Sequence, residues 1–240
     1  MIGIELDFEQ FRLVRRERGK VLEFAEGPVN QLSGFKGEDV YLCFRAPKTI
    51  GKLYEGKVSP GLVGQELGTV FETRKRSFKS RDGSFTFVGG VEKDTYNSVL
   101  ELVNSIKIPR LRRLDFSPFV LHDLLYFFNF ALKHKDFIAL SFNGKYFFYA
   151  ICKGSIVRLV SSAESAGAME LIPELVKTFF EEGLNFFVLT GDYSKEILSG
   201  LKEISEDGEI EILNPFIEFK IATSKEVKQA AFSNALGVTL

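Results

Sequence analysis

The sequence predicts an α/β fold built from two similar halves. The first observation is composition: 45% of the 240 residues are hydrophobic, and 25 phenylalanines supply apolar side chains for a substantial core. The second is a run of three short strand-like segments that occurs twice along the chain. The third is the alternation of helical and strand-like segments after each run. No low-complexity linker separates the halves, so we expect two lobes that pack against each other.

The first half begins with three predicted strands, at Ile2–Asp7, Phe11–Arg16 and Lys20–Phe24. Only about 15 residues then connect to the next strand, too few for the usual crossover helix and its loops, so we expect a trimmed first lobe. Apolar residues at helical spacing, such as Val63 and Leu67, predict the helices that follow. The remaining elements predicted in this half are strand Val40–Arg45, helix Pro60–Glu72, strand Ser84–Val88, helix Val91–Ile106, strand Leu111–Phe116 and helix Pro118–Leu132.

The second half repeats the plan with strands at Phe137–Phe142, Tyr146–Cys152 and Ile156–Ser161. Asn143-Gly144, between the first two, is a strong signal for a two-residue hairpin turn. These strands are apolar on both faces, so we expect their sheet to be covered on both sides. The remaining predicted elements are helix Leu171–Glu182, strand Phe186–Leu189, helix Ser194–Ile204, strand Ile210–Leu213 and a last helix from about Ser224.

Composition excludes several classes of protein. A net charge of −1 argues against a duplex nucleic-acid binder, which needs a broad basic surface. With two histidines and no CxxC spacing, the chain offers little for a metal site or a catalytic triad. We expect Cys43 and Cys152 to be buried, reduced thiols. Phe119–Leu132, the most apolar stretch, is shorter than the ~20 residues of a membrane span, so we expect a cytoplasmic protein.

A strand meander followed by helix–strand alternation, present twice, is the plan of the actin-like (ASKHA) architecture. In that fold a nucleotide lies between two lobes, and its phosphates contact the first hairpin turn of each lobe. We therefore expect a first lobe at residues 1–132, with an inserted α/β subdomain at about 39–116. The second lobe is expected at 133–240, with a C-terminal helix that returns to the first.

Several motifs resemble the PilM/GspL group of actin-like proteins of type IV pilus and type II secretion systems. They are Gly3-Ile4-Glu5-Leu6-Asp7, the segments at 85–93 and 112–121, Phe187-Val188-Leu189-Thr190-Gly191-Asp192 with Ser199-Gly200-Leu201, and the ending Ala235-Leu236-Gly237-Val238-Thr239-Leu240. The resemblance implies a cytoplasmic scaffold, peripheral to the inner membrane through its partner. That partner would be the cytoplasmic N-terminal tail of a PilN-like single-span protein, held in a groove of the first lobe within Val40 to Phe116. A secretion ATPase is a further partner that the resemblance implies.

The resemblance also marks candidate nucleotide-site residues, several of which depart from the family pattern. The candidates are Gly3, Glu5 and Asp7 at the first turn, Ser141, Asn143 and Gly144 at the second, and Thr190 and Gly191 in the adenosine motif. Asp7 and Asp192 stand where the family has glycines. Two like unit charges 4 Å apart cost about 4 kcal/mol at an effective dielectric of 20, so Asp7 disfavours a phosphate unless a cation lies between them.

We therefore expect a degenerate nucleotide site, no bound cofactor and no enzymatic activity. The alternative is an actin-like ATPase or a small-molecule kinase with substituted phosphate loops, which would take ATP with Mg²⁺. Each candidate also has a purely structural interpretation. Asp7 can belong to a solvated turn, Asn143-Gly144 to a hairpin tip, and Thr190-Gly191 to a tight strand-to-helix turn.

Basic residues cluster between the predicted helix Pro60–Glu72 and the next strand, at Arg74-Lys75-Arg76, Lys79 and Arg81. We expect a loop here. It is either solvated or in contact with an acidic partner or anionic headgroups, each basic residue near such a membrane surface contributing about 1 kcal/mol.

Overall fold

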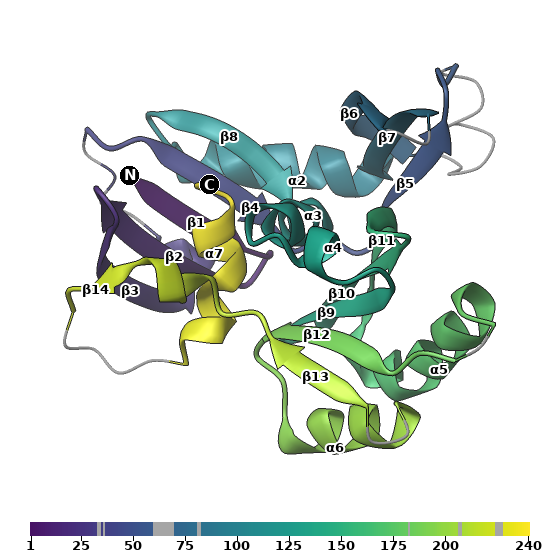
Figure 1. Cartoon of the computed structure of the whole chain (residues 1–240). Helices are drawn as coiled ribbons and strands as arrows, with labels where there is room; N and C mark the ends of the chain where they lie inside the picture. The colour runs from purple at the N-terminus through teal and green to yellow at the C-terminus, as the bar shows by residue number, and fades with distance from the viewer. Residues whose placement is uncertain are drawn as a thin grey trace.

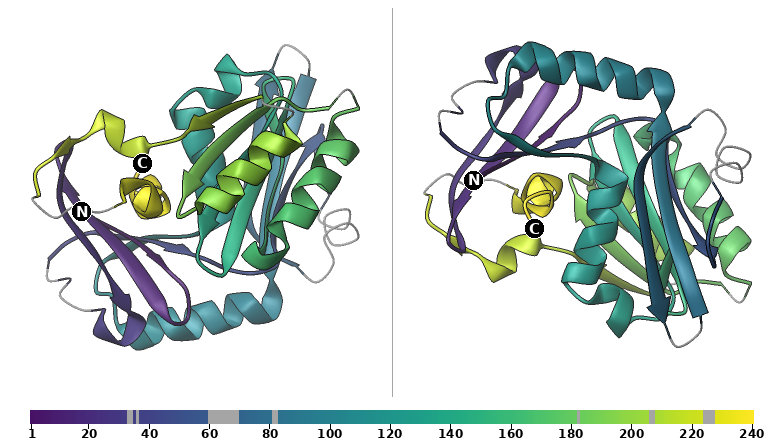
Figure 2. Two further views of the ribbon diagram at one scale, coloured as in Figure 1. Left: turned by 90° about the horizontal axis from the view of Figure 1, so that it is seen from below. Right: turned by 90° about the horizontal axis from the view of Figure 1, so that it is seen from above.

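The computed structural model describes residues 1–32, 35, 37–59, 70–80, 83–181, 183–205, 208–223 and 228–240. Two β-sheets form the framework, and the C-terminal helix α7 (Ser233–Gly237) lies between them (Figures 1 and 2). The first sheet has six strands and the second has eight.

The first sheet has the strand order β14-β3-β2-β1-β4-β8. Its strands are β1 (Ile2–Leu6), β2 (Gln10–Glu17), β3 (Lys20–Pro28), β4 (Val40–Phe44), β8 (Leu111–Phe116) and β14 (Lys220–Ile221). Successive side chains of β1 point to opposite faces. Ile2, Ile4 and Leu6 join the main core cluster with helix α2 (Lys93–Ile106), which covers the outer face (Figure 2). Gly3 and Glu5 therefore face α7 and the second sheet.

The second sheet has the order β13-β12-β9-β10-β11-β5-β7-β6. Its strands are β5 (Thr49–Glu55), β6 (Val70–Ser80), β7 (Gly83–Glu92), β9 (Phe137–Asn143), β10 (Tyr146–Lys153), β11 (Ile156–Glu164), β12 (Phe186–Gly191) and β13 (Glu209–Ile212). Helices α5 (Ala168–Phe179) and α6 (Lys195–Ile204) pack on the outer face. Helices α3 (Ser117–Phe127) and α4 (Phe130–Lys133) pack on the inner face. The expected burial of both faces is confirmed.

Close backbone packing fixes α7 against the first sheet. A Cβ atom on Gly3 would lie 1.8 Å from the carbonyl oxygen of Ala235, so only glycine allows this approach of β1 to α7. Four short 3-10 helices complete the described elements: η1 (Val29–Gln31), η2 (Ser165–Gly167), η3 (Pro215–Glu218) and η4 (Gln229–Phe232). Within the described residues between β3 and β4, η1 is the helical segment, as expected for a trimmed first lobe.

Both predicted meanders are confirmed, but parts of the segment between them were wrongly predicted. Residues 60–69 of the predicted helix Pro60–Glu72 lie outside the described residues, while Val70–Glu72 belong to strand β6, because their backbone pairs with β7. The basic cluster expected in a loop lies in β6 up to Lys79, and Arg81 is outside the described residues. Strand β5 was not predicted.

Two other helix predictions need correction. The predicted helix Pro118–Leu132 breaks at Asn129, whose φ of 59° is left-handed, so that α3 and α4 are separate. Helical structure near the C-terminus starts at Gln229; residues 224–227, where a last helix was expected, lie outside the described part.

The segment 39–116 contributes to both sheets. Strands β4 and β8 belong to the first sheet, whereas β5, β6 and β7 extend the second through the pairing of β5 with β11. The division into lobes at residue 132 stays a prediction. Cys43 and Cys152 are both buried and free, as expected. Among the described residues, no helix is both long and apolar enough to span a membrane.

Candidate functional site

The candidate residues on β1 and β9 meet in a buried polar cluster between the two sheets. Glu5 is fully buried, and its carboxylate accepts hydrogen bonds from Ser117 Oγ at 3.1 Å, from Asn234 Nδ2 at 2.8 Å and from Asn143 Nδ2. Asn234 Nδ2 also lies 3.5 Å from Ser141 Oγ. Strands β1, β9 and helices α3 and α7 therefore share one carboxylate.

Asp7 stabilises its own turn and pairs with an arginine. Its Oδ1 accepts hydrogen bonds from the backbone N–H groups of Glu9 at 2.8 Å and Gln10 at 2.7 Å. Its Oδ2 lies 2.9 Å from Arg45 Nη2. Because β1 and β4 are parallel with Leu6 opposite Phe44, the next residue of each strand brings Asp7 and Arg45 together. The positive charge beside the Asp7 carboxylate is thus the guanidinium of Arg45.

Arg12 links the first sheet to the second sheet and the C-terminal segment. It stands opposite Glu5 in the antiparallel pairing of β1 with β2. Its Nη1 donates hydrogen bonds to Asn143 Oδ1 and to the carbonyl oxygen of Ala231, and its Nη2 donates to Asp192 Oδ2 at 3.2 Å. Arg45 Nη1 lies 3.5 Å from the same Asn143 oxygen.

Asp192, which replaces a glycine of the family motif, is held by two cations. Lys228 Nζ lies 3.0 Å from its Oδ1, and Arg12 approaches its Oδ2. Burial alone would raise the pKa of Asp192, but the hydrogen bond and charge of Lys228, together with Arg12, lower it below its ordinary value. The carboxylate is therefore ionised at neutral pH and already neutralised by its neighbours.

Thr190 and Gly191 end strand β12 in contact with the protein itself. Thr190 is fully buried and its Oγ1 lies 2.8 Å from Ser233 Oγ. Gly191 has a φ of +84°, and a Cβ there would lie 2.0 Å from the carbonyl oxygen of Phe142. Gly144, with a φ of +66°, occupies the β9–β10 hairpin turn. These positions support the structural interpretation of both motifs as tight turns.

The structure thus joins Glu5, Ser141 and Asn143 in one cluster, with Asp7 connected through Arg45. The partners that the sequence analysis missed are Arg12, Arg45, Ser117, Lys228 and Asn234. Arg12 and Arg45 could have been found from strand register, which pairs each with a candidate acid. Ser117 and Asn234 carry no local signal, because long-range packing brings them to Glu5.

Little in the cluster is free to react with or bind another molecule. Burial raises the pKa of the Cys43 thiol well above its ordinary value, and the charge of Glu5 adds to this, so the group stays protonated. Among the described residues of the cluster, two buried side-chain atoms make no hydrogen bond: Arg45 Nε and Asn234 Oδ1. A bound molecule would gain few contacts unless it displaced existing ones.

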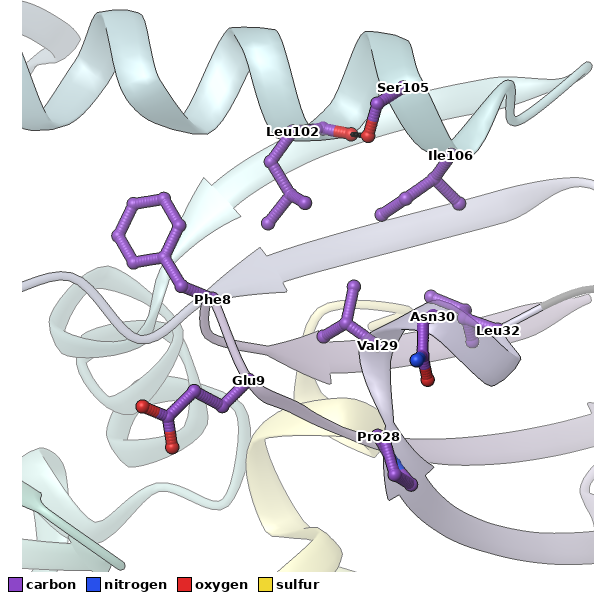
Figure 3. Close-up of a pocket in the computed structure, with 9 residues that line it drawn as sticks. All are labelled: Phe8, Glu9, Pro28, Val29, Asn30, Leu32, Leu102, Ser105 and Ile106. Carbon is purple, nitrogen blue, oxygen red and sulfur yellow. Dashed lines mark hydrogen bonds between the residues drawn. The ribbon is translucent and has the colours of Figure 1, made fainter.

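A groove with a volume of about 610 Å³ opens between helix α2, η1 and the β1–β2 turn (Figure 3). Leu102 and Ile106 of α2 point toward Val29 of η1 on the opposite wall, and Phe8 lies at one end. Phe8 is 49% exposed, although its ring packs 5.0 Å from that of Phe44. The groove is lined by Phe8, Glu9, Pro28, Val29, Asn30, Leu32, Leu102, Ser105 and Ile106.

No protein-family model matches the sequence, and no curated protein matches it. Solved structures do. The PilM–PilN type IV pilus biogenesis complex contains a chain that is 13% identical with a TM-score of 0.69, covering 99% of this chain and 96% of that one. A Bacteroides thetaiotaomicron protein with an actin-like ATPase fold and unknown function has a TM-score of 0.56 at 13% identity, covering 100% and 95%.

The structure is also similar to the cytoplasmic domain of EpsL, an inner-membrane component of the type II secretion system of Vibrio cholerae. It is 13% identical with a TM-score of 0.51, and the match covers 98% of this chain and 93% of that one. Likeness at such identity concerns the fold, and here it includes both lobes. The protein therefore has the two-lobed actin-like fold, and its structure is PilM-like over the whole chain.

Proposed function

We propose that this protein is a non-catalytic scaffold of a type IV pilus or type II secretion machine, working at the cytoplasmic face of the inner membrane. The whole-length likeness to the chain from the PilM–PilN complex carries the proposal, since it covers nearly all of both molecules. The likeness to EpsL, described as an inner-membrane component, supports the same setting.

The proposed partner is the N-terminal cytoplasmic tail of a PilN-like single-span membrane protein, bound in the groove between α2 and η1. Leu102, Ser105 and Ile106 lie within the segment Val40 to Phe116, where the groove was expected. Its other wall comes from the β1–β2 turn and the end of β3.

Chemistry of the lining supports a tail that is apolar and basic. Leu102, Ile106 and Val29 offer apolar contacts to alternate side chains of an extended peptide. Glu9, exposed at one end, offers a carboxylate. Cytoplasmic segments beside a membrane span carry an excess of Lys and Arg, so a basic residue of the tail can pair with Glu9.

A labelled peptide from the tail of a single-span protein encoded beside this gene is expected to bind, as measured by fluorescence anisotropy. Phe8→Ser and Ile106→Asn are each expected to weaken binding about tenfold, because burying a large apolar side chain contributes roughly 1.5–3 kcal/mol. Ile217→Ser is the control: Ile217 is 80% exposed and does not line the groove, so this variant should bind the peptide as tightly as the wild type. No binding at about 100 μM peptide would contradict the proposal.

We further propose that the site between the lobes is a degenerate nucleotide site, filled by the protein's own charges. Arg12 and Arg45 supply the positive charge that phosphates would seek, but Asn143, Asp7 and Asp192 already hold both. An incoming triphosphate would have to break these pairs while facing carboxylates, which costs several kcal/mol.

ATP, with or without Mg²⁺, is accordingly expected to leave the Tm of the protein unchanged within about 1 °C, because a ligand that does not bind the folded state cannot stabilise it. Differential scanning fluorimetry measures this directly. A rise of several degrees that Asp7→Lys abolishes would instead support the rival function, an actin-like ATPase or small-molecule kinase.

A further inference from the structure

The three strands β5, β6 and β7 carry a basic surface that the tail-binding groove does not use. Figure 1 shows them at the upper right edge of the molecule, away from helices α5 and α6. Toward the β6–β7 turn, the exposed cationic residues described on and beside these strands are Lys57, Lys75, Arg76 and Lys79, and the exposed acidic residue described there is Glu55. At the other end of β5 and β7, Lys48 pairs with Glu92, and Lys93 is followed by the exposed Asp94. The surface is therefore positive, in a chain whose net charge is −1.

Cations lie on both faces of strand β6. Lys75 Nζ approaches the carbonyl oxygen of Val58 at 3.5 Å, so Lys75 points to one side of the sheet, and alternation places Lys79 on that side. Arg76 points to the other side, toward helix α3, where its Nη1 lies 3.7 Å from Asp123 Oδ1. The side chain of Arg76 is nevertheless 61% exposed.

The neighbouring Arg74 shows by contrast which charges are already used. Its guanidinium donates to Asp115 at 2.9 Å and to Asp123 at 2.7 Å, and its side chain is 8% exposed. Arg74 therefore holds β6 against α3 and β8. The cations further along β6 make longer contacts, 3.7 Å from Arg76 to Asp123 and 3.5 Å from Lys75 to the Val58 carbonyl, and they are exposed, so an external anion can reach them.

An exposed aromatic ring stands among these cations. Phe78 is 39% exposed, and its ring stacks on the buried Phe85 with 5.9 Å between centroids, which holds it in place. Phe78 and Arg76 also border an apolar pocket of about 210 Å³ that Leu53, Phe87 and Tyr126 help to line. Apolar surface thus lies directly beside the positive charge.

We propose that the β6 strand and its flanking residues bind the headgroups of anionic phospholipids. Basic residues attract the negatively charged cytoplasmic leaflet, while aromatic rings settle at the level of the headgroups. Lipid headgroups form a layer in which anions can contact the cations on both faces of β6. An acidic peptide in a groove would meet one face only. This contact is additional to attachment through a membrane partner.

Co-sedimentation with lipid vesicles tests the proposal on the full chain without any partner. The protein is expected to bind phosphatidylcholine vesicles that contain roughly 30% phosphatidylglycerol, and to remain free of pure phosphatidylcholine vesicles. Raising NaCl to about 0.5 M should release it, because salt screens exposed charges.

The double variant Lys75→Glu/Lys79→Glu is expected to lower the vesicle partition coefficient at least about twentyfold, since each basic residue near the surface contributes roughly fivefold. Lys195→Glu/Lys202→Glu on α6 changes the net charge equally at two exposed positions and should retain binding within about twofold. Phe78→Ser should weaken binding without altering its dependence on salt. All these positions are exposed, so circular dichroism should show an unchanged fold.

Three results would overturn the proposal: equal binding to neutral and anionic vesicles, equal losses in the two charge variants, or no binding to anionic vesicles at all. In the last case, binding of a polyglutamate peptide that Lys75→Glu/Lys79→Glu abolishes would assign the surface to an acidic protein partner instead. Because the test needs no tail peptide, its failure leaves the proposed groove function untouched.

Discussion

Replacing Glu5 with alanine is expected to lower the free energy of unfolding by about 3–5 kcal/mol. The substitution removes the one acceptor shared by Ser117, Asn143 and Asn234. The buried Ser117 hydroxyl and Asn234 amide would then keep only their longer contacts, to the Phe44 carbonyl oxygen at 3.4 Å and to Ser141 Oγ at 3.5 Å. Asn143 then also loses the contact that orients its amide toward Arg12 and Arg45. Urea unfolding followed by circular dichroism measures the loss.

Two further variants test whether the shared carboxylate is the cause. Glu5→Gln keeps one acceptor oxygen and the side-chain volume, so its loss should fall between those of the wild type and Glu5→Ala. Asp7→Ala removes a carboxylate that is 23% exposed, and water can replace part of what it bonds, so about 1 kcal/mol is expected. A loss below about 1 kcal/mol for Glu5→Ala would contradict the role assigned to the cluster.

The repeated meanders are predictable from sequence because their signals are local. Apolar and polar residues alternate along β1 and β2, and Asn143-Gly144 has the composition of a hairpin turn, with Gly144 at a φ of +66°. Alternation and turn residues need no knowledge of distant neighbours. The same signals, occurring twice, led to the two-lobed fold.

Strand β6 could not be predicted in this way. Val70 and Phe71 fit helical spacing with the apolar residues before them, and nothing local excludes a helix. The pairing with β7, with Phe71 opposite Val91, decides the conformation. Strand β5 is similarly hidden, because Gly51 has no side chain to show alternation; a Cβ there would lie 2.5 Å from the ring of Phe87.

The sequence predicted which turns form the candidate site, but the side chains that hydrogen-bond there are known only from the tertiary structure. Sequence marked Glu5 and Asn143 as residues near the turns of the two lobes, and they do meet. The sequence could not indicate Asn234, which hydrogen-bonds to Glu5 although the two residues lie near opposite ends of the chain. Gly3 and Gly191 illustrate the same limit. A glycine in the sequence suggests that another group approaches the backbone closely, but only the structure shows that this group is the protein's own backbone, at Ala235 and Phe142.

Gly191→Ala is expected to destabilise the protein by more than about 3 kcal/mol, a large effect for the addition of one methyl group. The added Cβ would lie 2.0 Å from the carbonyl oxygen of Phe142 and 2.8 Å from its nitrogen. The same carbonyl accepts the N–H of Asp192 at 2.6 Å, so the contact cannot open without breaking a backbone hydrogen bond. No flexible side chain is available to move aside. Strands β9 and β12 would have to separate.

Gly154→Ala separates this clash from ordinary backbone strain. Gly154 also has a positive φ, +64°, but a Cβ there would meet no atom within 4 Å. Its substitution therefore carries only the cost of a left-handed alanine, about 1–2 kcal/mol. Urea unfolding of both variants should thus show a clearly larger loss for Gly191→Ala. Equal losses would mean that β12 can move away from β9, and the end of β12 would then have room for a ligand that the packing described above denies it.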